Sequence, residues 1–206
     1  MSPPNWLPPL NFHDEFELSA VAAQLEFPQN NPTLLQDYFL ISTNVFVAFS
    51  PNNFSSNEEI FPGLSIAEDY AVPCYKLTSP TLAHQAISEI LNDMSIPFEL
   101  NQVSWRERHF IGDINFQENV DNLSESIWNF ACSLTEKTYN EGFNILPFNL
   151  SIIKMVTIPD DQHDTWSRWY DDNMMADPDF EEDYMEAISR PRTAEELLYD
   201  VNPDGY

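Results

Sequence analysis

The excess of acidic residues is the feature that most constrains this chain. Its 34 Asp and Glu residues stand against 8 Lys and Arg residues, which gives a formal net charge of -26 over 206 residues. Such a charge keeps a protein in solution but destabilises its compact state by self-repulsion, and it repels nucleic acid and anionic membranes. It also attracts basic surfaces. The composition therefore argues against direct binding of nucleic acid or a membrane and favours a basic protein partner.

The chain nevertheless has enough apolar residues to build a core. Hydrophobic residues make up 43% of the sequence and aromatic residues 14%, whereas a disordered chain of this charge would be poorer in both. The length fits one domain, or one domain with an extension. An alternative explanation of the charge is adaptation to a high-salt cytoplasm. The low Lys content fits that explanation, but the many Asn, Ile and Phe residues fit it poorly.

The cysteines and the N-terminus indicate a soluble, cytoplasmic protein. Cys74 and Cys132 are the two cysteines, and they form no CxxC pair, which favours two buried thiols in a reducing compartment over a disulfide or a metal site. Residues 1–9 lack the basic and apolar regions of a signal peptide. No apolar run approaches the roughly 18 residues that a membrane span needs.

The charge divides the chain into two parts. Residues 1–159 hold 19 acids and 5 bases, whereas residues 160–206 hold 15 acids and 3 bases in less than a quarter of the length. We therefore expect a folded body over 1–159, with a Pro-rich arm at 3–9, and an acidic C-terminal extension rich in aromatic residues over 160–206.

The pattern of the body predicts an α+β fold, an antiparallel sheet with helices packed on it. Helices are expected at 12–27, 80–93 and 122–140. Strands are expected at 38–49, 60–66, 71–77, 96–105, 109–116 and 150–158. An alternative for 38–49 is two strands that turn near Asn44. Pro73 places the strand at 71–77 near a sheet edge. The extension follows the last strand.

Helical spacing of apolar residues supports each predicted helix. The first carries Phe16, Ala20, Ala23 and Phe27; the second carries Leu82, Ile87, Ile90 and Leu91; the third carries Leu123, Ile127, Phe130, Ala131 and Leu134. Ser79 and Pro80 are typical of a helix start, and Gly142 of a helix end. The alternation of Val103, Trp105, His109 and Ile111 predicts that one face of a strand is buried.

Two runs in the body carry a resemblance to a known family. The first run begins with Tyr75-Lys76-Leu77, continues through the helix at 80–92 and ends with Pro97-Phe98-Glu99-Leu100. The second run begins with His109-Phe110-Ile111-Gly112-Asp113-Ile114 and continues into the helix at 123–134. In element order, residues 12–140 resemble the class I type III secretion chaperones and their YbjN-like relatives. Proteins of this family are small, acidic and usually dimeric, so the resemblance implies a non-catalytic homodimer that binds an unfolded or extended segment of a client.

Several kinds of enzyme site are excluded by the glycine pattern. The four glycines (Gly63, Gly112, Gly142 and Gly205) are too far apart to form a phosphate-binding loop or a dinucleotide-binding fingerprint. No GxSxG nucleophile elbow occurs. We therefore expect no enzymatic activity, no catalytic residues and no cofactor.

The strongest metal candidate is the run Asp160-Asp161-Gln162-His163-Asp164, to which His109 or His13-Asp14 could add ligands in space. The favoured interpretation is a solvated acidic loop, so no metal site is predicted. The carboxylate-rich run 177–183 lacks the spacing and the central Gly of a calcium-binding EF-hand.

Arg106 and Arg108 lie two residues apart in a predicted strand, so they share one face. They are two of only eight basic residues. Two interpretations remain open: a solvent face that pairs with nearby acids, or a contact for an anion or a client.

The extension interleaves acids with large apolar side chains, a composition suited to binding a basic groove or rim. Asp177 and Pro178 are typical of a helix start, with Phe180, Tyr184 and Ile188 on one face. The alternative is that this face packs on the protein's own body. The predicted partner-binding residues are Trp166, Trp169, Tyr170, Asp171, Asp172, Asp177, Asp179, Phe180, Glu181, Glu182, Asp183, Tyr184 and Glu186.

Three functions remain open at this point. The first is a chaperone-like, non-enzymatic binding module that engages a basic or extended client protein. The second is an inhibitor of the immunity type that mimics nucleic acid and blocks a nuclease or another DNA- or RNA-binding protein. The third is a metal-dependent hydrolase that uses the run 160–164.

Overall fold

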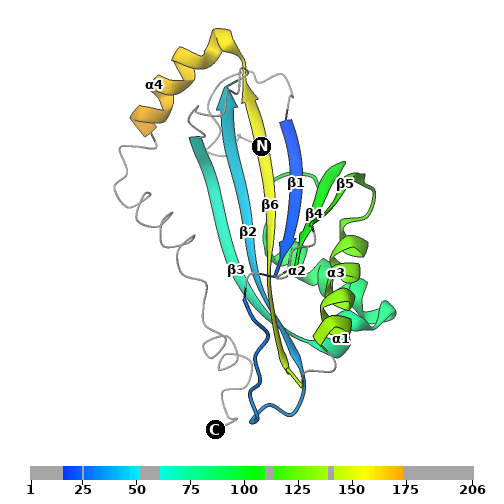
Figure 1. Cartoon of the computed structure of the whole chain (residues 1–206). Coiled ribbons are helices and arrows are strands. Elements are labelled where there is room, and N and C mark those ends of the chain that lie inside the picture. The colour runs from blue at the N-terminus through cyan, green and yellow to red at the C-terminus, as the bar shows by residue number, and fades with distance from the viewer. Residues whose placement is uncertain (1–15, 25, 52–60, 110–113, 139–141, 174–206) are drawn as a thin grey trace.

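The computed structural model describes residues 16–24, 26–51, 61–109, 114–138 and 142–173. These residues form a six-stranded sheet with four α-helices packed on it (Figure 1). The strands are β1 (Phe16–Ala23), β2 (Tyr38–Pro51), β3 (Phe61–Pro73), β4 (Val103–Arg108), β5 (Ile114–Val120) and β6 (Ile145–Ile158). The helices are α1 (Cys74–Thr78), α2 (Pro80–Asp93), α3 (Leu123–Thr138) and α4 (His163–Asn173), with a 3-10 turn, η1 (Asp160–Gln162), before α4.

The α+β class predicted from the sequence is confirmed, but the sheet is mixed. The strand order is β3-β2-β6-β1-β4-β5. The pairs β2–β3, β1–β6 and β4–β5 are antiparallel, whereas β1–β4 and β2–β6 are parallel. The expectation of an antiparallel sheet is thus wrong for two pairs. The last strand in the chain, β6, inserts between β1 and β2 and runs parallel to β2. The chain returns through α1 and α2 and places β4 parallel to β1, on the other side of β1.

The first predicted helix is wrong, because residues 16–23 form strand β1. Phe16 and Ala20 are four residues apart, a spacing that fits one face of a helix and also one face of a strand. Leu18 and Ala22 complete the strand face, and both are buried. Tertiary pairing with β6 and β4 decides between the two interpretations.

Several strand boundaries also differ from expectation. The two strands predicted at 60–66 and 71–77 are one strand, β3, which ends where helix α1 begins at Cys74. Strand β2 continues past Asn44 without turning. Strands β4 and β5 are displaced toward the C-terminus from the predictions at 96–105 and 109–116. Strand β6 starts five residues before the predicted 150 and includes Pro147.

The predictions for α2 and α3 are confirmed. Helix α2 begins with Pro80 at its first position, although the Ser79 side chain makes no capping hydrogen bond. Helix α3 begins after Asn122, whose Oδ1 accepts a hydrogen bond from the Glu125 backbone N–H at 3.2 Å. This is the side-chain cap that satisfies one of the free donors at a helix N-terminus.

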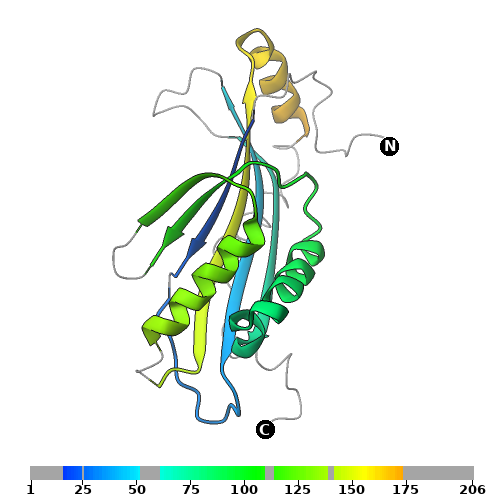
Figure 2. The same cartoon turned by 90° about the vertical axis from the view of Figure 1, so that its right-hand side faces the viewer.

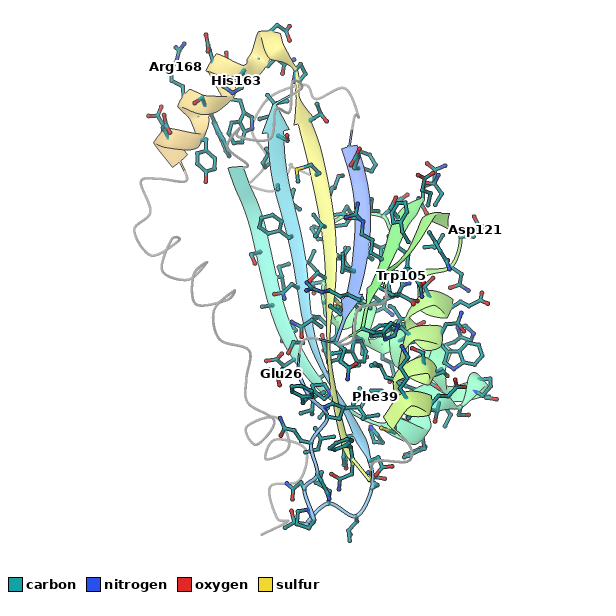
Figure 3. All side chains as sticks on the ribbon, viewed as in Figure 1. Glu26, Phe39, Trp105, Asp121, His163 and Arg168 are labelled. Carbon is teal, nitrogen blue, oxygen red and sulfur yellow. The ribbon has the colours of Figure 1, made fainter. Side chains whose placement is uncertain are left out.

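Helices α1, α2 and α3 cover one face of the sheet and enclose the main core with it (Figure 2). Figure 3 shows Phe39 and Trp105 between the sheet and these helices. The buried face includes Phe39, Ile41, Val45, Val103, Trp105, Leu146, Phe148, Leu150 and Ile152. Helix α4 lies at the opposite end of the sheet (Figure 1).

Among the described residues, no helix is long and apolar enough to cross a membrane.

Candidate protein-binding surfaces

Two aromatic residues predicted to bind a partner are buried in the protein itself. Trp166 of α4 has no exposed surface, and its ring centroid lies 5.2 Å from that of Phe49 in β2. Tyr170 is 8% exposed and stacks on Trp166 with the ring centroids 5.0 Å apart. Together with Val47 and Ile158 they form a second, smaller core cluster. The start of the extension, helix α4, therefore packs on the body. The face of Phe180, Tyr184 and Ile188, for which packing on the body was the alternative, lies outside the described residues.

The other predicted partner-binding residues divide into two groups. Trp169 is half-buried beside Trp166, and Asp171 and Asp172 are exposed at the end of α4. The remaining ones lie outside the described residues: Asp177, Asp179, Phe180, Glu181, Glu182, Asp183, Tyr184 and Glu186. Of the described candidates, Asp171 and Asp172 are thus the most accessible to a partner.

The structure does not bring the metal candidates together. His163 and Asp164 lie in the first turn of α4, at the opposite end of the sheet from Trp105 (Figure 3). His109 follows strand β4, close to Trp105. No group of three or more His, Cys, Asp or Glu side chains within the described ranges is placed to hold a metal ion. His13 and Asp14 lie outside those ranges.

The buried histidine belongs to a structural cluster around Glu107. The carboxylate of Glu107 accepts hydrogen bonds from Trp105 Nε1 at 2.9 Å and from Asn115 Nδ2 at 3.2 Å. His109 Nε2 lies 3.8 Å from the same carboxylate, and the imidazole stacks on Phe130. His109 is 5% exposed, so a substrate has little access to it. The cluster holds the end of β4 against α3.

The two thiols are free and poorly suited to nucleophilic chemistry. Burial, and then the negative charge of Asp37, raise the pKa of Cys74 to about 12. Burial and Glu136 also raise the pKa of Cys132, which is only half-buried. Because the thiolate is the reactive form, raised pKa values keep both groups inert at neutral pH.

Arg106 and Arg108 are both exposed on β4, and alternation places them on the sheet face that α1, α2 and α3 leave open. The Arg106 guanidinium lies over the Phe116 ring, 5.2 Å from its centroid. Arg106 also lines a shallow hollow of about 670 Å³ between β1, β4 and β5. Gln102 and Asn119, both with positive φ, line it too.

Strand β3 forms one edge of the sheet and pairs only with β2 among the described strands. In an antiparallel pair, backbone groups that bond the neighbouring strand alternate along the chain with backbone groups that face away from it. The Cys74 N–H donates to the Asp37 carbonyl at 2.8 Å, and this bond fixes which residues of β3 face β2. Backbone groups of Ile66, Glu68 and Tyr70 then face β2, and those of Ser65, Ala67, Asp69 and Ala71 face outward. The Glu68 carbonyl accepts a hydrogen bond from Thr43 Oγ1 of β2, which agrees with an orientation of this carbonyl toward β2.

A groove of about 560 Å³ lies beside this edge, between β3 and the C-terminal half of α2. Its lining combines apolar and acidic side chains: Tyr70, Val72, Ala86, Ile90, Glu89 and Asp93, with Lys76 of α1. Burial, and then the charges of Asp93 and Glu68, raise the pKa of Tyr70 to about 12. The Tyr70 hydroxyl oxygen is itself buried and has no hydrogen bond within 3.5 Å among the described residues, although Asp93 lies close enough to affect it.

No protein-family model, no curated protein and no solved structure matches this chain.

The sequence placed the strand that holds Pro73 near a sheet edge, and β3 does lie at an edge among the described strands. The length of this edge and the groove beside it were missed. Residues 71–77 were predicted as a strand separate from 60–66, which hides the long edge of β3. One signal was present: helix 80–93 ends on Asp93 and has no basic residue in its last turn. Such an end is unfavourable for a helix, because its C-terminus carries a partial negative charge.

Proposed function

We propose that this protein is a non-catalytic, acidic binding module that engages a basic or extended protein segment in a chaperone-like way. The observation that carries the proposal is the exposure of its carboxylates on strands β1, β3 and β5, on helices α2, α3 and α4, and on the turns beside them. Exposed acids include Glu17, Glu68, Glu89, Asp93, Glu99, Glu118, Asp121, Glu125, Glu136, Asp161, Asp164, Asp171 and Asp172.

The few basic groups do little to neutralise this surface. Arg106 lies over Phe116, and the Lys154 ammonium lies 4.3 Å from the centroid of the Phe16 ring and 5.4 Å from that of Phe98. Each of these contacts is with an aromatic ring and uses no carboxylate. With 8 Lys and Arg residues against 34 Asp and Glu residues, the bases are too few to neutralise the surface. A basic partner would relieve the repulsion among the carboxylates, and many exposed pairs over one surface accelerate encounter.

The proposal is tested with two unfolded proteins of equal length, one basic and one acidic, in a fluorescence-anisotropy titration at about 0.05 M and about 0.5 M salt. We expect the basic chain to bind and its affinity to fall steeply at the higher salt, because surface charges are screened there. The acidic chain should not bind.

Suppression of aggregation of the basic chain, followed by light scattering, separates the two binding roles. A chaperone-like module keeps the unfolded chain soluble. An inhibitor that mimics nucleic acid would instead ignore unfolded chains and compete with DNA for a folded nuclease. Failure to bind any basic protein at low salt would refute both roles.

A further inference from the structure

The edge of β3 has the properties of a site for strand addition. Of the four residues whose backbone groups face outward, Ser65, Ala67 and Ala71 have small side chains, which leave room for a neighbouring strand, and Asp69 adds a carboxylate. A partner strand placed there would direct alternate side chains to the two faces of the sheet. On the face covered by the helices, those side chains would meet the groove between β3 and α2.

The groove has the chemistry to accept a long cationic side chain. Val72, Ala86 and Ile90 offer an apolar wall for a methylene stem. Glu89 and Asp93, both exposed, place carboxylates at the end of α2, where the helix dipole adds further negative potential. A Lys or Arg head group in this position would be attracted by the two carboxylates and by the negative end of the helix dipole.

The Tyr70 hydroxyl gives a second reason to expect a hydrogen-bond donor in the groove. Its oxygen is buried and accepts no hydrogen bond within 3.5 Å among the described residues, because its interaction with the Asp93 carboxylate uses the hydroxyl as the donor. An ammonium group has three donors and no acceptor, so one cation can serve a hydroxyl oxygen and two carboxylates together. Lys76 lines the groove as well, but no ion pair within 4.0 Å joins it to Glu89 or Asp93 in the described structure.

Charge decides which occupant the edge accepts. A second copy of the chain would bring another -26 charge and would place Glu68 of both copies near one shared edge. The C-terminal residues 174–206 carry ten acids against two bases, Arg190 and Arg192, a net charge of -8, and this net charge would be repelled by Glu89 and Asp93. A basic extended segment from another protein is the occupant with complementary charge.

We infer that the β3 edge and the adjoining groove bind an extended segment of a partner protein by strand addition, with one Lys or Arg side chain of that segment in the groove. This inference rests on the proposed function and specifies its partner and its place on the molecule.

The probe is a labelled peptide of about ten residues, with Val and Thr alternating around a single central Lys. Three matched peptides carry acetyl-lysine, Arg or Glu at that position, and a fourth carries N-methyl groups on alternate backbone nitrogens. Binding to the full-length protein is followed by fluorescence anisotropy. We expect the Lys and Arg peptides to bind, and the acetyl-lysine, Glu and N-methylated peptides to bind at least about tenfold more weakly, since each loses charged or backbone hydrogen bonds.

The double variant Glu89→Gln with Asp93→Asn should lower the affinity for the Lys peptide by about tenfold or more. The control is Glu118→Gln with Asp121→Asn, which removes the same charge near the opposite edge, at the end of β5, and should leave the affinity within about threefold because its charges are distant and screened. If both variants lower the affinity for the peptide equally, the groove is not the binding site, and non-specific electrostatic attraction to the acidic surface explains the binding.

Hydrogen exchange measured by NMR locates the strand. On addition of the Lys peptide, the amides of Ala67 and Ala71 should exchange more slowly, whereas those of Ile66 and Tyr70, directed to β2, should already be protected. Unchanged exchange at Ala67 and Ala71 would overturn strand addition. Slow exchange there before peptide is added would also overturn it, and sedimentation would then distinguish a second copy from the chain's own residues.

The outcomes separate this inference from the broader function. If the unfolded basic chain binds but the peptide contacts neither the edge nor the groove, only the inference fails. If neither binds, the proposed function fails as well.

Discussion

The ring of Trp166 lies against the ring of Phe49, with 5.2 Å between their centroids, so helix α4 is attached to the end of strand β2. Trp166 is fully buried, and the small cluster around it includes Tyr170 and Ile158. The acidic extension therefore begins as part of the folded structure. An aromatic residue placed this way stabilises the fold and is not available to a partner.

Changing Trp166 to Ala should destabilise the protein by about 3–5 kcal/mol, because it removes a large buried side chain and leaves a cavity. Urea unfolding followed by circular dichroism measures the effect. Trp169→Ala is the matched control, since Trp169 is only half-buried and should cost clearly less. Equal losses would mean that α4 does not depend on the contact with Phe49. A chain cut at Pro159 should show a loss at least as large as that of Trp166→Ala, since it lacks the whole helix.

Stability should fall in alkaline solution. The pKa of Cys74 is raised from 9.0 to about 12 and that of Tyr70 from 10.0 to about 12, so both groups hold their protons more tightly in the folded state. Their stabilising contribution is complete below about pH 9 and is lost as the pH rises toward 12. For Cys74 the slope is about 1.4 kcal/mol per pH unit.

Urea midpoints between pH 8 and pH 11 test this dependence. Cys74→Ala should lose stability at every pH from its smaller side chain, but its stability should decline less steeply above pH 9 than that of the wild type. Parallel curves for the two proteins would show that Cys74 does not titrate as its burial requires.

Asp93→Asn should stabilise the isolated protein by about 0.3–1 kcal/mol, because Asp93 ends α2 with a negative charge at the negative pole of the helix. The same change should weaken binding of a basic segment. A rise in melting temperature together with lower affinity would identify Asp93 as a residue kept for binding at the expense of stability. Loss of stability instead would show that Asp93 has a favourable contact within the fold.

The acids at 177–186 lie outside the described residues, and their contribution remains a prediction. Changing Asp179, Glu181, Glu182, Asp183 and Glu186 to their amides should slow association with a basic partner and flatten its salt dependence, with the fold intact. Changing Phe180 and Tyr184 to Ala should mainly speed dissociation. Stopped-flow kinetics at several salt concentrations distinguish the two effects, and unchanged rates would move the binding surface to the body.

Local signals in the sequence determined helices α2 and α3. Pro80 marks the start of one, Asn122 caps the other, and apolar residues at helical spacing give each a buried face. These features are local because the hydrogen bonds of a helix join residues four apart. The α+β class followed from them, together with the β-branched and aromatic run that forms β2.

Only the tertiary structure decided the identity of β1 and the arrangement of the sheet. The spacing between Phe16 and Ala20 suits a helix and a strand equally, and pairing with β6 selects the strand. The position of β6 between β1 and β2 makes the β2–β6 pair parallel, and the strand order leaves β3 at an edge beside α2 among the described strands. The groove next to Tyr70 and Asp93 follows from that edge. Strand pairing depends on contacts between residues far apart in the chain, so periodicity within a single segment cannot reveal it.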